Sequence, residues 1–152
     1  MIDSLKDFIV LDLDGTVADV SHRVHLAQAK AWDDFHAACV YDKVVEATAQ
    51  IISQLSNYNF IMVTGRTERH RPATERWLED NQLARYIHTL LMRGDDDFRQ
   101  DGEMKLALLE EYFGSKQSVL NNVLLCLDDR DRVVEAFRNY GLTCWQVREG
   151  DY

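Results

Sequence analysis

The chain has 152 residues, enough for one domain that buries a hydrophobic core. Hydrophobic residues make up 46% of it and charged residues 28%, with a single proline, which is typical of a globular protein and excludes a disordered or fibrous chain. The formal net charge of −9 excludes a protein that coats a phosphate backbone by bulk attraction, so a nucleic-acid ligand would have to be gripped locally, at a terminus.

No apolar run approaches the length of a membrane span, and because the stretch 1–7 is short and polar we expect no signal peptide. The chain has three cysteines, an odd number, at widely spaced positions in mainly apolar surroundings: Cys39, Cys126 and Cys144. This pattern favours reduced core thiols over a disulfide framework or a zinc site. We therefore expect a cytoplasmic protein that makes no contact with membranes.

Apolar, β-prone runs predict five buried strands, over 8–13, 60–64, 87–92, 123–127 and 143–147. Helical periodicity fills the intervals, over 24–38 with Ser21 as the N-cap, over 44–55, from Pro72 onward, over 106–113 closed by Gly114, and over 133–140 closed by Gly141. Strands that alternate with helices predict an α/β fold with a Rossmann-like parallel sheet and right-handed crossovers. The interval between the first two strands is long enough for two helices.

The first strand ends in Asp12-Leu13-Asp14-Gly15-Thr16. The carboxyl ends of strands are where open α/β sheets place their chemistry. Two carboxylates there can bind a hard cation and supply a nucleophile and an acid or base. A calcium loop of the EF-hand kind is excluded, because its twelfth position, counted from Asp12, is Arg23 and not a glutamate. A plain turn stays open for this segment taken alone.

Three further pieces follow in order along the chain. Thr64-Gly65-Arg66 places a hydroxyl and a cation after the second strand, Lys105 opens a later helix, and Asp128-Asp129 ends the fourth strand. A Thr-Gly turn and a helix-borne lysine are each common by themselves. All of these pieces together, each after an apolar strand or at the start of a helix, indicate one site at a single edge of the sheet.

In these motifs and their order, the chain resembles the haloacid dehalogenase-type (HAD) phosphatases. It resembles more closely the 3′-phosphatase domains of the bacteriophage polynucleotide kinase–phosphatase family. That likeness covers nearly the whole chain, from Arg23 eleven residues after Asp12, through 99–101 before Lys105, to the carboxyl-terminal stretch 127–152. The resemblance implies one HAD domain over 1–152 with a small helical cap at about 17–45. The chain departs from the family in that cap and in the loop after Arg66. It also lacks the Gly-x-x-x-x-Gly-Lys-Ser/Thr loop, so 5′-kinase activity is not expected of it.

Chemistry and resemblance together suggest roles for the acidic motifs. A phosphomonoester dianion repels nucleophiles until its charge is neutralised, and Mg²⁺ fits that need. Asp12 and Asp128 are expected to bind the metal directly, Asp129 from the outer shell or through a water molecule, and Asp14 through its main-chain carbonyl. Asp12 would attack phosphorus to form an aspartyl-phosphate, and Asp14 would protonate the leaving oxygen and later activate water.

The remaining site residues would bind the substrate. Thr64 and Lys105 would hold the non-bridging phosphate oxygens, and Asp101, four residues before Lys105 on a helix, would orient its ammonium group. Arg23 and Arg66 are the expected substrate-side cations, since a planar guanidinium matches phosphate oxygens in a bidentate manner. Arg99 is a further candidate, for which a surface salt bridge is the competing interpretation.

Aromatic residues can either stack a base or belong to a hydrophobic core. Trp32 and Phe35 stack a base if they face the cleft, but their place on a helical stripe favours the core of the cap. Trp77 and Trp145 are predicted to be core residues.

We therefore expect a magnesium-dependent phosphomonoesterase that removes the 3′-phosphate from DNA or RNA ends, with 2′,3′-cyclic phosphate ends as a further substrate class implied by the resemblance. A separate kinase and a ligase are its expected pathway partners. One alternative is a HAD phosphatase of a small phosphorylated metabolite or mononucleotide, with the same catalytic residues. The other is a module that binds a nucleic-acid end or a protein without turnover, which the intact set of motifs disfavours.

Overall fold

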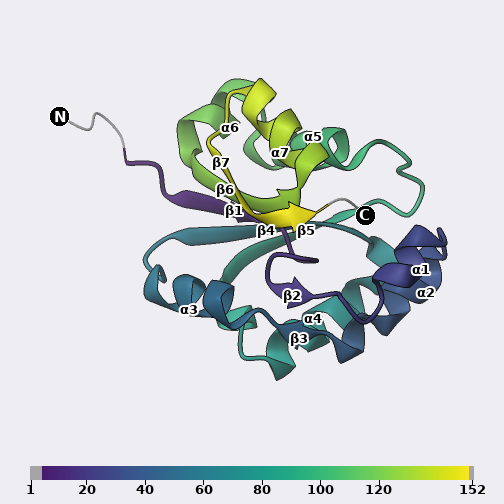
Figure 1. Cartoon of the computed structure of the whole chain (residues 1–152). Helices are drawn as coiled ribbons and strands as arrows, with labels where there is room; N and C mark the ends of the chain where they lie inside the picture. The colour runs from purple at the N-terminus through teal and green to yellow at the C-terminus, as the bar shows by residue number, and fades with distance from the viewer. Residues whose placement is uncertain (1–4, 151–152) are drawn as a thin grey trace.

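The computed structural model describes residues 5–150 and is built on a five-stranded sheet (Figure 1). The strand order is β5-β4-β1-β6-β7, and each neighbouring pair is parallel. The strands are β1 (Phe8–Leu11), β4 (Asn59–Thr67), β5 (Ile87–Arg93), β6 (Val123–Arg130) and β7 (Cys144–Gly150). This sheet confirms the predicted α/β fold and the five predicted strands.

Helices cover both faces of the sheet (Figure 1). One layer holds α3 (Glu46–Gln54) and α4 (Arg71–Asp80), and the other holds α5 (Asp101–Phe113), α6 (Lys116–Asn122) and α7 (Asp131–Tyr140). Side chains of β1 alternate between two cores, with Ile9 and Leu11 in the first and Val10 in the second. A strand buried on both faces needs a continuous apolar run, which is why this segment was readable from the sequence.

The predicted helix ends are confirmed where glycine or proline sets the backbone. Pro72 lies in the first turn of α4. Gly114 and Gly141 end α5 and α7 with φ values of 90° and 111°, a left-handed conformation that glycine adopts without steric cost. The short helix α6 was not predicted, because its seven residues carry no extended apolar stripe.

Trp77 is buried as predicted, but Trp145 is 62% exposed, so its assignment to the core is wrong. The reason is that Trp145 lies on β7, an edge strand in which every residue between Cys144 and Gly150 is exposed. The three cysteines are buried and free, as predicted. Within residues 5–150, no helix is both long and apolar enough to cross a membrane.

The stretch between β1 and α3 is a small subassembly beside the sheet (Figure 1). Its two-residue strands β2 (Ala18–Asp19) and β3 (Lys43–Val44) pair in an antiparallel manner. Between them lie α1 (Val24–Gln28), α2 (Trp32–Ala37) and the 3₁₀ turn η1 (Ala38–Tyr41). Val20, Ala27 and Phe35 form its own small core.

The single helix predicted over 24–38 is wrong. The chain turns between α1 and α2, where Lys30 has a φ of 57°. Ser21 is not an N-cap either, because α1 follows Arg23 and the Ser21 N–H donates to Asp19 Oδ1 at 2.9 Å. An apolar period of three and four residues continues across the turn because both short helices pack into the same small core, α1 with Ala27 and α2 with Phe35. Two further 3₁₀ turns, η2 (Glu68–His70) and η3 (Ala84–Tyr86), flank α4.

Candidate active site

The acidic motifs converge at the carboxyl edge of the sheet. Because β1 lies between β4 and β6, its last residue Leu11 pairs with Met62 on one side and with Leu127 on the other. The Asp12 N–H then donates to the Leu127 carbonyl at 2.9 Å, which brings Asp12 beside Asp128 on β6. The sheet register therefore assembles residues that are more than a hundred positions apart in the chain.

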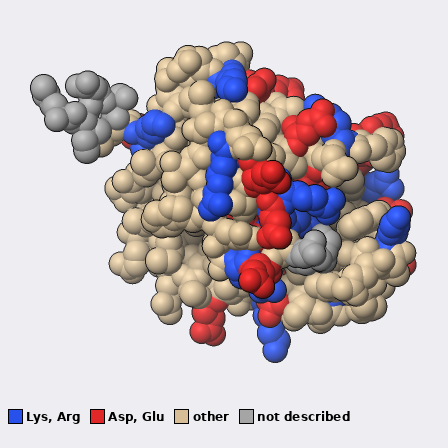
Figure 2. Space-filling view, turned by 45° about the horizontal axis from the view of Figure 1, so that its top comes forward, with Lys and Arg blue, Asp and Glu red and all other residues tan. Residues whose placement is uncertain are grey.

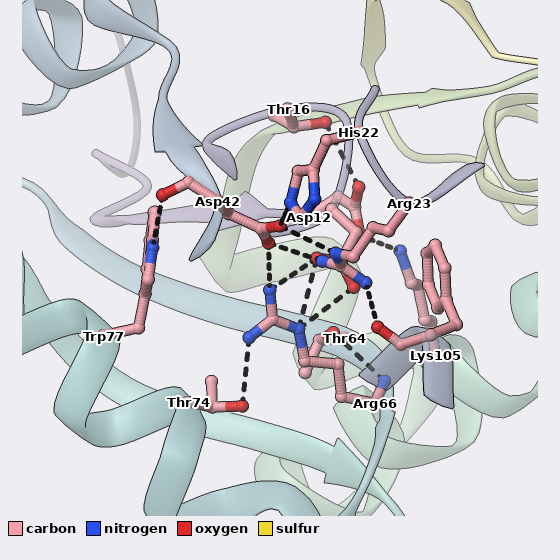
Figure 3. Close-up of polar contacts among 12 residues, drawn as sticks. Asp12, Thr16, His22, Arg23, Asp42, Thr64, Arg66, Thr74, Trp77 and Lys105 are labelled. Atoms are coloured by element: carbon pink, nitrogen blue, oxygen red, sulfur yellow. Dashed lines mark hydrogen bonds and ion pairs between the residues drawn. The ribbon is translucent and has the colours of Figure 1, made fainter. Parts of the chain in front are cut away.

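Lys105 on α5 contacts two of these carboxylates, and Figure 3 shows its contact with Asp12. Its Nζ is 2.6 Å from Asp12 Oδ1 and 2.7 Å from Asp128 Oδ2, and the side chain is almost fully buried. Thr16 donates its hydroxyl to Asp12 Oδ2 at 3.2 Å. Burial opposes the charge on Lys105, but the two carboxylates outweigh it and raise the pKa of the ammonium group.

Asp12 shares its surroundings with two other acids. Burial raises the pKa of Asp12 well above its usual range, repulsion from Asp128 and Asp129 adds to this, and attraction to Lys105 acts against it. One carboxylate oxygen from each of Asp12, Asp128 and Asp129 lies within 4.8 Å of the others. A crowded set of buried oxygen donors is the environment that a divalent cation stabilises, so these residues fit Mg²⁺ by donor chemistry.

Asp14 lies in a different environment, between two arginines. Arg23 Nη2 and Arg66 Nη2 each approach Asp14 Oδ1 to 2.6 Å. Although burial by itself would raise it, the pKa of Asp14 lies far below its usual range because of Arg66 and Arg23. Asp14 is therefore a carboxylate in the free protein at any ordinary pH.

Asp42 completes this network and was missed by the sequence analysis (Figure 3). Its carboxylate accepts from Arg23 Nε at 2.7 Å and from Arg66 Nη2 at 3.1 Å. Its carbonyl accepts the Trp77 indole N–H at 2.9 Å, which fixes it against α4. Asp42 precedes β3 without any motif around it, so no local signal marks it; only the fold brings it to the two guanidinium groups.

The residues predicted to bind substrate divide into two groups. Arg23, Arg66 and Thr64 are fully buried, and both arginines are paired with Asp14 and Asp42. The Thr64 hydroxyl accepts the main-chain N–H of Arg66 at 3.2 Å. The structure thus brings Arg23 and Arg66 to Asp14, and Thr64 lies next to Arg66.

Asp101 and Arg99 lie nearer the surface. Asp101 pairs with Arg93 and Arg130, while the Lys105 ammonium contacts the other acids. Burial opposes ionisation of Asp101, but Arg130, Lys105 and Arg93 together lower its pKa. Arg99 forms a surface ion pair with Asp97 at 2.6 Å, as its competing interpretation expected.

A cleft with a volume of about 550 Å³ opens above these residues. Asp12, Asp14 and Lys105 line it together with aromatic side chains from α2 and from the loop 94–100, and with arginines from several elements. On the face drawn in Figure 2, basic and acidic side chains are interspersed and do not separate into two regions. This distribution suits a local grip on a small charged group better than a long electrostatic track.

The fold and the edge-of-sheet acids define an α/β protein of the HAD class. Residues 6–152 match the family described as the polynucleotide kinase PNKP phosphatase domain, and the chain belongs to that family. A chain of the solved Pnkp1/Rnl/Hen1 complex is 30% identical over 99% of this chain, with a TM-score of 0.77. A chain of the Pnkp1/Rnl/Hen1 RNA repair complex is 29% identical over 99%, with a TM-score of 0.79. This chain spans about half of their length, 49% and 45%.

A more distant likeness concerns the fold alone. The L-2-haloacid dehalogenase from Xanthobacter autotrophicus with chloropropionic acid covalently bound is 14% identical. The alignment covers 94% of this chain and 78% of that one, with a TM-score of 0.69. The sheet and its flanking helices are thus shared with the HAD hydrolases, as the motifs indicated.

Proposed function

We propose that this protein is a magnesium-dependent phosphomonoesterase that removes the 3′-phosphate from DNA or RNA ends through an aspartyl-phosphate on Asp12. Ends that carry a 2′,3′-cyclic phosphate are a second substrate class of the same proposal. The observation that carries it is the convergence of Asp12, Lys105 and Asp128, the first two of which line an accessible cleft, in a chain of the PNKP phosphatase family. We further propose that 1–152 forms one HAD domain and that 17–45 is its cap.

Asp12, Asp128 and Asp129 would hold Mg²⁺ through their carboxylates, together with the Asp14 main-chain carbonyl. When bound, the ion supplies charge neutralisation for the phosphate dianion. Lys105 would hold a phosphate oxygen from the same side, because its ammonium group already lies 2.6 Å from Asp12. Thr64 would provide a further contact to phosphate oxygen from β4.

The proposed reaction has two displacements. Asp12 Oδ forms a bond to phosphorus while the bond from phosphorus to the sugar 3′-oxygen breaks, and Asp14 gives its proton to that oxygen. A water molecule then gives its proton to Asp14 and attacks phosphorus. The bond between phosphorus and Asp12 breaks, inorganic phosphate leaves, and a 3′-hydroxyl remains on the nucleic acid.

The acid role of Asp14 depends on its two arginines. Arg23 and Arg66 keep Asp14 ionised in the free protein. A phosphate dianion in the cleft competes for the same guanidinium groups, because arginine pairs with phosphate and carboxylate in the same bidentate geometry. We infer that substrate binding loosens the arginines from Asp14 and so permits its protonation, which gives Arg23 and Arg66 their expected role toward substrate.

The setting of the reaction follows from the relatives. The solved chains that this protein resembles come from an RNA repair complex. A phosphatase that leaves a 3′-hydroxyl prepares an end for sealing, so we propose a kinase and a ligase as partners in the same pathway.

The test uses purified protein with Mg²⁺ and two matched oligonucleotides that bear either a 3′- or a 5′-phosphate. An aryl phosphate and a 3′-mononucleotide serve as small substrates, and Asp12→Asn protein serves as the blank. We expect rapid phosphate release from the 3′-phosphorylated oligonucleotide and none from its 5′ counterpart. Faster release from the small phosphates would instead assign a metabolite phosphatase, and binding without release would assign a nucleic-acid-end binding module.

A further inference from the structure

Two exposed aromatic side chains line the cleft that contains Asp12 and Lys105. Trp32 on α2 is 45% exposed and Phe98 in the loop 94–100 is 90% exposed. A scattered exposed aromatic is ordinary on a protein surface. Here two exposed aromatic side chains line the same cleft as a set of buried acids. They therefore leave apolar surface uncovered at the place where a ligand must enter. The expectation that Trp32 belongs to the core of the cap is therefore wrong, whereas Phe35 is buried as that expectation requires.

Trp32 is held in place from within the protein. Its ring packs edge-on against Phe35, with centroids 6.0 Å apart, and stacks on His36 at 6.5 Å with an interplanar angle of 27°. The Arg23 guanidinium lies 4.1 Å from the centre of the Phe35 ring and donates to the Phe35 carbonyl at 2.9 Å. Since Arg23 also binds Asp14 in the free protein, these contacts link the Trp32 ring to the proposed catalytic acid.

The loop that carries Phe98 is fixed by polar contacts on both sides of that residue. Arg93 donates to the carbonyls of Asp97 and Arg99, each at 2.8 Å, and Arg99 pairs with Asp97 at 2.6 Å. The Arg69 N–H donates to Asp95 Oδ1 at 2.9 Å. These contacts order the backbone while the Phe98 ring projects into solvent, and they neutralise acids that would otherwise repel a nucleic acid.

Arg132 supplies a positive charge at the same cleft. It is exposed, lies in the first turn of α7 and is one of the residues that line the cleft. The other arginines of the cleft each pair with a carboxylate: Arg69, Arg93, Arg99 and Arg130. Among residues 5–150, no carboxylate forms a hydrogen bond or ion pair with the Arg132 side chain, so its guanidinium is available to a ligand.

We propose that Trp32 and Phe98 form a base-stacking subsite for the 3′-terminal nucleotide, and that Arg132 binds the next phosphodiester. This inference rests on the proposed function and names how that site would select a nucleic-acid end over a small phosphate ester. Stacking tolerates every base, because each base has a π face, so the subsite requires a base without choosing among them. The acidic net charge fits a grip made by two rings and one unpaired cation.

The test compares kcat/KM for three substrates: a 3′-phosphorylated oligonucleotide, the same oligonucleotide with an abasic terminal nucleotide, and glycerol phosphate. Trp32→Ala and Phe98→Ala are each expected to lower kcat/KM about tenfold for the normal end. Both should leave the abasic end and glycerol phosphate within about twofold of the unmodified protein. Trp32→Tyr should restore most of the loss, since a phenol ring also stacks.

Trp145→Ala is the matched control, because Trp145 is an exposed tryptophan that does not line the cleft. This substitution should leave kcat/KM unchanged for all three substrates. Arg132→Gln should lower kcat/KM for both oligonucleotides and reduce the slope of log kcat/KM against log salt by about one, with glycerol phosphate unaffected. Unchanged turnover of glycerol phosphate shows that each variant is folded.

Two outcomes overturn the inference in distinguishable ways. If the protein dephosphorylates 3′ ends but treats normal and abasic ends alike, or if Trp32→Ala and Phe98→Ala affect both ends equally, the stacking subsite is wrong and the proposed function stands. If the protein cleaves glycerol phosphate and no oligonucleotide, the proposed function fails as well.

Discussion

Asp12 and Asp14 are two residues apart, yet they lie in opposite electrostatic environments. Asp12 faces two other acids and one ammonium group, and its pKa is raised. Asp14 faces two guanidinium groups, and its pKa is lowered. Residues two apart share a face of a regular strand, but β1 ends at Leu11, before this motif, and Gly15 turns the chain with a φ of 85°. The backbone beyond the strand can therefore place two identical carboxylates in two different sites.

The difference teaches how one side-chain type can serve two chemical roles. Neighbouring charges, and not the residue itself, decide which carboxylate attracts a cation and which is held as an anion by arginines. The Asp12 environment sets one ammonium group, that of Lys105, against three clustered carboxylates. The Asp14 environment already has its counter-ions. Single substitutions can remove either environment and leave the other in place.

The largest expected effect concerns the covalent step. Asp12→Asn should lower kcat by about a thousandfold or more, because the nucleophile is lost. Asp14→Asn should lower it by about a hundredfold or more, the usual contribution of a general acid or base. With an aryl phosphate, whose leaving group needs no acid, Asp14→Asn protein should retain a phosphoryl group on Asp12. Intact-protein mass spectrometry after an acid quench measures this, and equal labelling of Asp12→Asn protein would contradict the assignment.

The two substitutions should differ in their effect on stability, although both lower kcat strongly. Asp14→Asn leaves two buried guanidinium groups short of a counter-ion, and breaking such a buried pair costs about 3–5 kcal/mol in the free energy of unfolding. Asp12→Asn removes a carboxylate whose charge is already disfavoured, so we expect a change below about 1 kcal/mol.

Denaturant unfolding without Mg²⁺ measures both values. Asp42→Asn serves as the companion variant, since Asp42 pairs with the same arginines and lies outside the acid cluster. It should lose stability much as Asp14→Asn does. Equal stability losses for Asp12→Asn and Asp14→Asn would refute the contrast.

Magnesium should stabilise the Asp12 side selectively. At about a hundredfold excess over its dissociation constant, Mg²⁺ should raise the free energy of unfolding by about 2.7 kcal/mol, and EDTA should reverse the effect. Asp128→Asn removes one of the clustered carboxylates and should abolish this gain. Asp42→Asn should retain it. Thermal melting with and without Mg²⁺ checks all three proteins, and a full gain in Asp128→Asn would place the metal elsewhere.

The smallest expected effect concerns the pH dependence of stability, which depends on His36, a buried residue near Arg23, Arg66 and Asp14. Burial lowers the pKa of His36 to about 4, while its ordinary value is 6.5. Between these values the unfolded chain binds a proton that the folded protein excludes, so stability falls as the pH is lowered from 6.5 toward 4. From pH 7 to pH 5, His36→Gln should lose about 2 kcal/mol less stability than the unmodified protein. Urea unfolding at both pH values measures this difference; the exposed His25→Gln, as a control, should match the unmodified protein.

Local signals were sufficient where one segment determines the outcome. The apolar runs predicted the strands, because a strand buried on both faces is continuous in sequence. Gly114 and Gly141 marked helix ends because they adopt a left-handed backbone there. The acid motif at the end of β1 was equally local, and its residues do lie at the edge of the sheet beside Lys105 and Asp128.

Other features depend on pieces that are distant in the chain. The turn at Lys30 could not be predicted because the apolar spacing of α1 continues unchanged into α2. Trp145 was misplaced because its exposure follows from the edge position of β7, a property of strand order. Asp42 was missed because an isolated aspartate gains meaning only when two arginines from separate elements reach it.

The sequence by itself determined the fold class, the family and the identity of the acids, lysine and arginines that meet at the sheet edge, since each follows from short patterns and their order. Only the tertiary structure decided which charges pair. In the folded protein Arg23 and Arg66 pair with Asp14 and Asp42, and Asp101 pairs with Arg93 and Arg130. Trp32 and Phe98 line the same cleft. The physical reason is that pairing and exposure depend on distances between segments, and packing sets those distances, whereas the local pattern does not contain them.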